Sequence, residues 1–134
     1  MNSREFNKHL SGVKVGGYWG RGNMLFDREY IFIEYQEAVN ACKWVAKELG
    51  WFEYNPNRSD CDNYAILWSG KMMEWFARNT IYNETPTFGM LWGNYNGESH
   101  MWNFFMTGPK ELYHVNYGVI STPRSWSADG SIVA

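Results

Sequence analysis

The stretch Asn57-Arg58-Ser59-Asp60-Cys61-Asp62-Asn63-Tyr64-Ala65 marks the point where a polar loop turns into an amphipathic helix. Ser59 and Asp62 match the S-x-x-D/E capping box, so Ser59 is the predicted N-cap and Cys61 the second helical residue. The helix is expected to run from about Cys61 to Asn79. Its apolar stripe recurs at three- and four-residue steps: Tyr64, Ala65, Trp68, Met72, Trp75 and Phe76.

The segments on either side of this helix predict an α+β fold. A short strand over 29–35 leads into a first helix, Gln36 to Leu49, which Gly50 closes. Strands are expected after the second helix near 87–93, 99–107 and 111–120, with turns at Asn96-Gly97 and Gly108-Pro109. The expected architecture is two helices followed by a small antiparallel meander.

The 134 residues fit one domain. Residues 1–23 are rich in glycine and aromatic residues, which predicts an N-terminal arm. Residues 24–134 are the expected single α+β domain.

Composition excludes several classes of function. The net charge is −2 with no basic run, which argues against a nucleic-acid partner. No apolar run approaches the ~18 residues that would span a membrane, and no signal peptide is recognisable at the N-terminus. We therefore expect a cytoplasmic protein whose two cysteines are reduced, with Cys42 a small buried hydrophobe.

Three residues have the order of a thiol-dependent hydrolase: Cys61 on a first helical turn, His100 on a later strand, and Asn116 on the next strand. The helix dipole and a nearby imidazolium would favour the thiolate, although Asp60 and Asp62 would oppose it. If Gly108-Pro109 makes a tight hairpin, Asn116 lies diagonal to His100 on the same face and can orient its ring.

Other polar residues have possible supporting roles at such a site. The backbone N–H of Cys61 and the side chain of Asn55, or alternatively Asn57, could stabilise an oxyanion. His114 is an alternative base and would pair near position 104. Aromatic residues expected to line a groove are Trp92, Trp102 and Tyr64, and Trp102 could also shield the His100 hydrogen bond from water.

Four segments resemble the papain-like cysteine proteases related to the protease domain of the mushroom agglutinin MOA and its phage and bacterial relatives. They are Asp60-Cys61-Asp62-Asn63-Tyr64-Ala65, Phe88-Gly89-Met90-Leu91-Trp92-Gly93, His100-Met101-Trp102-Asn103-Phe104-Phe105 and Tyr113-His114-Val115-Asn116-Tyr117.

The resemblance implies hydrolysis of a protein or peptide substrate at peptide or isopeptide bonds, with Cys61 as nucleophile and His100 as general base. The third family residue is often a Glu followed by Pro, where this chain has Asn116-Tyr117. The resemblance also raises calcium dependence, for which Asp60 and Asp62 are the candidate ligands, although no EF-hand-like loop is present.

Two non-enzymatic alternatives remain open from the sequence. A catalytically inactive, phage-type protein could bind a host protein partner through Trp19, Trp92, Trp102 and Trp126. A carbohydrate-binding module could use exposed aromatics, best represented by Trp92-Gly93-Asn94-Tyr95-Asn96. The sequence leaves the oligomeric state open.

Overall fold

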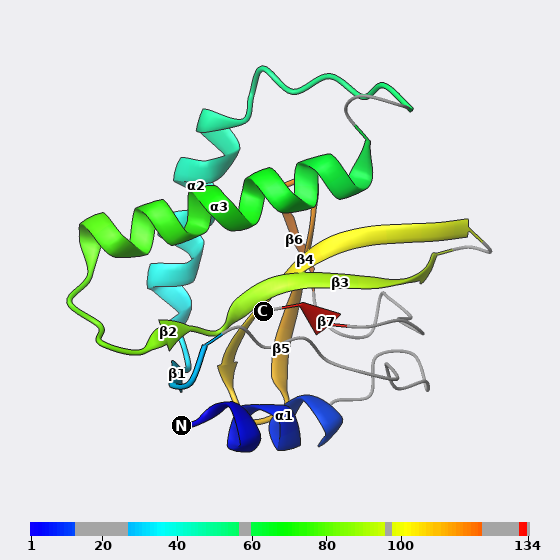
Figure 1. Ribbon diagram of the computed structural model, residues 1–134. Coiled ribbons are helices and arrows are strands. Elements are labelled where there is room, and N and C mark those ends of the chain that lie inside the picture. The colour runs from blue at the N-terminus through cyan, green and yellow to red at the C-terminus, as the bar shows by residue number, and fades with distance from the viewer. Residues whose placement is uncertain (13–26, 57–59, 96–97, 122–131, 134) are drawn as a thin grey trace.

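The computed structural model describes residues 1–12, 27–56, 60–95, 98–121 and 132–133. Within them the fold is α+β (Figure 1). The helices are α1 (Ser3–Gly12), α2 (Tyr35–Glu48) and α3 (Cys61–Asn79). The strands are β1 (Tyr30–Ile31), β2 (Thr85–Pro86), β3 (Phe88–Tyr95), β4 (Glu98–Gly108), β5 (Glu111–Asn116), β6 (Val119–Ser121) and β7 (Ile132–Val133).

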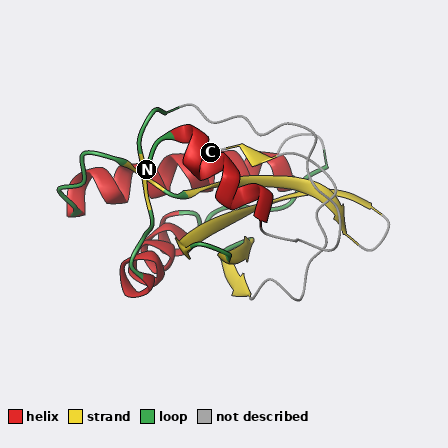
Figure 2. Cartoon of the chain, turned by 90° about the horizontal axis from the view of Figure 1, so that it is seen from below, coloured by secondary structure: helices red, strands yellow, loops and turns green. Residues whose placement is uncertain are grey.

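The main sheet has the order β6-β5-β4-β3-β7 with antiparallel neighbours, and β1 pairs with β2 in a small parallel sheet. Figure 1 places α2 and α3 on one side of the main sheet and α1 on the other. Figure 2 shows α1 in front of the strands and α3 behind them. The predicted meander corresponds to β3 to β6, whereas the addition of β7 next to β3 was not predicted.

Each face of the sheet carries its own core, because side chains along a strand alternate in direction. Phe105 belongs to a cluster shared with α2 and α3, in which Trp68 and Met72 are fully buried. Its neighbour Phe104 belongs to a second cluster with Trp102 and, from α1, Phe6. The sheet is therefore the middle layer of three.

The first helix corrects the prediction that residues 1–23 form an arm. Asn2 Oδ1 accepts a hydrogen bond from the Glu5 backbone N–H at 2.9 Å, and Glu5 Oε2 accepts from the Asn2 N–H at 3.1 Å. This reciprocal capping box starts α1, and burial of Phe6 anchors it. The pattern Asn2-x-x-Glu5 was the signal that could have predicted the helix. Residues 13–23 lie outside the described residues.

The other predicted elements agree with the structure with two exceptions. The expected strand over 111–120 is divided into β5 and β6 by a turn at Tyr117-Gly118, and the expected strand over 29–35 is shorter. The predicted ends of α2 are correct to within one residue, and those of α3 are correct. The expected strand over 29–35 shortens to β1, because Glu34 accepts hydrogen bonds from the N–H groups of Gln36 and Glu37 and caps α2. Among the described helices, none combines the length and apolarity that crossing a membrane requires.

Candidate functional site

Cys61 is the first residue of α3 and is partly exposed. The N-cap is Asp60, whose backbone N–H donates to Asn63 Oδ1 at 3.2 Å. The predicted N-cap was therefore one residue too early, and the capping residue at the third helical position is Asn63 rather than Asp62. Ser59 lies outside the described residues. Cys61 remains on the first turn, where free backbone N–H groups favour a negative charge.

Asn103 fixes the start of α3 against the sheet. The two N–H groups of its buried Nδ2 are shared among three acceptors: the Ala65 carbonyl at 2.9 Å, the Ser69 hydroxyl at 3.2 Å and the Gly89 carbonyl at 3.2 Å. Asn103 therefore ties the first turns of α3 to β4 and β3. The sequence pattern gave it no role because it faces away from His100, and that orientation is what lets it hold the helix.

His100 and Asn116 form the predicted pair. The register places Phe104 opposite His114 and Asn103 opposite Val115. The last residue of β5, Asn116, therefore lies near the level of Trp102 and diagonal to His100. His100 Nε2 lies 2.8 Å from Asn116 Oδ1. A carboxamide oxygen can only accept, so Nε2 carries the proton in this bond and the tautomer is determined.

The edge of β4 explains how Cys61 and His100 approach one another. Alternation directs His100 to the Trp102 side of the sheet, whereas α3 packs on the opposite side. The described pairs between β4 and β5 begin only at Asn103, so His100 lies beyond them at the strand edge. There its ring can border a space that α3 reaches from the other side.

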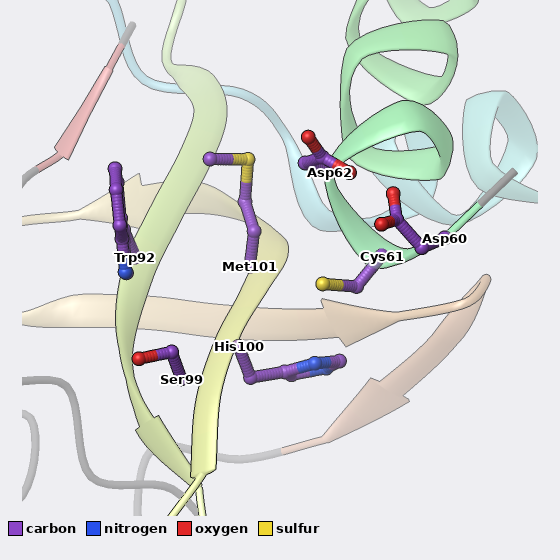
Figure 3. Close-up of a pocket in the computed structure, with 7 residues that line it drawn as sticks. All are labelled: Asp60, Cys61, Asp62, Trp92, Ser99, His100 and Met101. Atoms are coloured by element: carbon purple, nitrogen blue, oxygen red, sulfur yellow. The ribbon is translucent and has the colours of Figure 1, made fainter. Parts of the chain in front are cut away.

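That space is a pocket of about 220 Å³. Figure 3 shows the Cys61 sulfur directed from the helix start towards β4, with the His100 ring lying below it. The lining residues come from the start of α3 and from the β3–β4 pair: Asp60, Cys61, Asp62, Trp92, Ser99, His100 and Met101. The pocket thus holds a partly exposed thiol, an oriented imidazole and an apolar wall.

Two aromatic rings lie close to the imidazole. The Trp102 ring stacks on His100 at 5.8 Å between centroids with an interplanar angle of 18°, and the Tyr117 ring lies 6.1 Å away at 42°. Trp102 Nε1 donates to His114 Nδ1 at 2.8 Å. Burial lowers the pKa of His114 to about 4, so this core imidazole is neutral and accepts the indole N–H.

Two predicted groove residues are in fact core residues. Trp102 is 1% exposed and Tyr64 is 7% exposed, so neither presents a surface to a ligand. Trp102 packs in the core beneath His100, and Tyr64 packs edge-on against Phe52 at 5.1 Å. His114 is likewise buried, which removes it as an alternative base. Trp92, at 55% exposed, keeps its predicted place in the wall of the pocket.

Tyr117 lies close to both proposed reactive groups. Its pKa is raised to about 12, chiefly because burial disfavours the phenolate and also because of the nearby Cys61. The phenol therefore stays neutral across the physiological range. It contributes no negative charge that would oppose a thiolate at Cys61.

The comparisons with known proteins show the fold. No family model matches the chain, and no curated protein matches it. Among solved structures the chain is similar to Polyporus squamosus lectin, bound to the epitope Neu5Acα2-6Galβ1-4GlcNAc, with a TM-score of 0.78 and 13% identity. It is also similar to a structure described as a PSL1a–E64 complex, with a TM-score of 0.77 and 14% identity. The chain has a fold found in a mushroom lectin.

The similarity covers all of this chain but only part of the solved structures. It spans 51% of the PSL1a chain and 49% of the lectin chain, so this protein corresponds to about half of each. At this level of identity the likeness extends to the fold alone. It agrees with the α+β class predicted from the sequence.

Within the described residues, Asp60, Asp62 and Asn55 lack the geometry that their predicted metal and oxyanion roles require. Among the described residues no group of three or more His, Cys, Asp and Glu side chains could hold a metal ion. Asp60 and Asp62 line the pocket but do not make up such a group, so we derive no step through calcium. Asn55 is exposed and is not among the described residues that line the pocket.

Several predictions remain untested. Asn57, Trp19, Trp126 and the Asn96-Gly97 turn lie outside the described residues. The cytoplasmic location and the host protein partner stay predictions.

Proposed function

We propose that the chain is a papain-like cysteine hydrolase that cleaves peptide or isopeptide bonds. Cys61 is the nucleophile, His100 the acid–base group and Asn116 the residue that orients the imidazole. The observation that carries the proposal is the pocket that Cys61 and His100 share, with His100 Nε2 held by Asn116 Oδ1 at 2.8 Å. A nucleophile, a base and an orienting group in this relation are the minimum for covalent acyl transfer.

In the first half of the proposed reaction, the Cys61 thiolate attacks the carbonyl carbon of the scissile bond. Because Nε2 is engaged by Asn116, Nδ1 is the ring nitrogen that takes the thiol proton. A carbon–sulfur bond forms and the carbon–nitrogen bond breaks. Imidazolium Nδ1–H returns the proton to the departing amine, leaving a thioester on Cys61.

In the second half, His100 takes a proton from water, which attacks the thioester carbonyl. The carbon–sulfur bond breaks, the carboxylic acid product leaves, and the thiol is restored. The backbone N–H of Cys61, at the start of α3, is suited to stabilise the oxyanion in both halves. Asn55 stays a predicted second donor.

The similarity to the PSL1a structure supports the proposed reactivity of Cys61. The solved PSL1a structure is a complex with E64, an epoxide that alkylates reactive thiols. This chain has the same fold, with a partly exposed thiol at a helix start. Transfer of that reactivity to Cys61 is part of the proposal.

The test is covalent labelling by E-64, read by intact mass and peptide mapping. Cys42 is an internal control, because it is 3% exposed and burial raises its pKa to about 12. We expect one adduct, on Cys61, and none on the Cys61→Ser variant. An unmodified Cys61 in the folded protein would overturn the hydrolase proposal.

A second candidate function is glycan binding, favoured by the sialylated trisaccharide in the Polyporus squamosus lectin structure. The chain corresponds to about half of that lectin, so sugar binding by this half is itself part of the proposal. Trp92 is the exposed ring next to the pocket that could stack on a sugar. Glycan-array binding that survives Cys61→Ser and is lost in Trp92→Ala would support this function.

A further inference from the structure

The turn between β5 and β6 contains an unusual residue. Tyr117 has φ of 46° and Gly118 has φ of 83°, and they join Asn116 to Val119, which are register partners. A two-residue hairpin with both φ angles positive has the pattern of a type I′ turn, for which Asn-Gly is the preferred sequence. A bulky aromatic residue in the left-handed region is strained, and such residues persist where the surrounding structure holds them.

The surrounding structure does hold Tyr117 in place. Its ring lies 5.0 Å from that of Tyr64, which is itself buried between Phe52 and the turn. The Tyr64 hydroxyl also comes so close to Gly118 that a Cβ there would lie 3.1 Å from it. The strained turn is thus supported from α3, the helix that carries Cys61.

The Tyr117 ring lies next to the proposed catalytic imidazole. The buried Trp102 ring stacks on the His100 imidazole, and the ring of Tyr117, which is 36% exposed, lies 6.1 Å from it. In Figure 3 the His100 ring points towards the turn that joins β5 to β6. Asn116, which accepts the Nε2–H, is the residue immediately before Tyr117.

We propose that Tyr117 is a positioning residue that closes the solvent side of the His100–Asn116 hydrogen bond and holds the imidazole against Trp102. Its strained backbone is retained for this role. The proposal rests on the proposed hydrolase function for its catalytic consequence. A hydrogen bond shielded from water is stronger, and an imidazole held by neighbouring rings keeps its orientation in the pocket that it shares with Cys61.

Two substitutions separate positioning from simple turn formation. Tyr117→Asn gives the preferred Asn-Gly turn and removes the ring, whereas Tyr117→Phe keeps the ring and removes only the hydroxyl. For each variant we would measure the melting temperature, the solvent exchange of the His100 Nε2 proton by NMR, and the rate of Cys61 alkylation by E-64.

In Tyr117→Asn we expect a higher melting temperature, since the strain is relieved. We also expect His100 proton exchange to become at least about tenfold faster, because the hydrogen bond is exposed. The alkylation rate should fall about 10- to 100-fold as the imidazole loses its position. Tyr117→Phe should match the wild type in exchange and alkylation.

Unchanged exchange in Tyr117→Asn would overturn the proposal, whatever happens to the melting temperature. A melting temperature that falls instead would refute the claim that strain is retained there. If wild-type Cys61 fails to react with E-64, the hydrolase function fails separately, and the exchange comparison still decides whether Tyr117 shields the bond.

Discussion

His100 Nε2 and Asn116 Oδ1 are 2.8 Å apart, although the two residues are 16 positions apart in the chain. The β4–β5 hairpin brings them together, because its register places Asn116 near the level of Trp102, diagonal to His100. The bond fixes which imidazole nitrogen is protonated and leaves Nδ1 as the nitrogen that can accept a proton.

Asn116→Ala should lower the rate of Cys61 alkylation by E-64 about 10- to 100-fold, the kinetic equivalent of one hydrogen bond to an ionisable group. The imidazole then loses its preferred tautomer and orientation. Val119→Ala is the matched control, since Val119 pairs with Asn116 and is largely exposed. Equal rates for Asn116→Ala and wild type would show that the bond has no role in reactivity.

Asn103→Ala should lower the free energy of unfolding by about 2 kcal/mol, because the hydrogen bonds of its side chain to Ala65 and Ser69 in α3 and to Gly89 in β3 are lost. It should also lower Cys61 reactivity, since α3 is no longer held at its first turns. Ser69→Ala removes only one of these partners and should cost less. Urea denaturation measures both variants, and a cost for Asn103→Ala no larger than that of Ser69→Ala would refute this explanation.

The prediction for His114 concerns acid stability. Folding lowers its pKa from the ordinary 6.5 to about 4, so protonation opposes the folded state. The stabilisation of the folded state by neutral His114 is complete above pH 6.5 and is lost as the pH falls towards 4. The difference between the pKa of His114 in the unfolded and folded states corresponds to roughly 3 kcal/mol of unfolding free energy.

Denaturation between pH 7 and pH 4 tests the His114 prediction. His114→Gln keeps a side-chain oxygen that can accept the Trp102 N–H but cannot titrate in this range. Its stability should therefore change less with pH than that of the wild type. Parallel pH profiles for the two proteins would contradict the prediction.

The sequence predicted those parts of the fold and site that depend on local pattern. The bounds of α3 follow from its apolar stripe and its polar N-terminal cap, and the diagonal of His100 and Asn116 follows from one tight hairpin. The addition of β7 beside β3 is a long-range pairing with no local signal. The burial of Trp102 and Tyr64 could not be predicted either. The periodicity of a strand or helix indicates which face a side chain lies on, but not which other segment packs over that face.

Trp92→Ala should leave the unfolding free energy within about 0.5 kcal/mol of wild type, because the side chain is 55% exposed. If Trp92 contacts the substrate, its removal should raise KM for a cleaved peptide more than it lowers kcat. Ile81→Ala, which is also at an exposed position, is the control for non-specific surface effects. An unchanged KM would remove Trp92 from the substrate-binding surface.

The most direct measurement is the rate of Cys61 alkylation by iodoacetamide at pH 6 in the wild type and in His100→Ala. A thiol paired with an imidazole should react at least about tenfold faster than a free thiol at this pH, because the pair favours the thiolate. We predict this excess for the wild type and its disappearance in His100→Ala. Equal rates in the two proteins would contradict the claim that Cys61 and His100 act as one site.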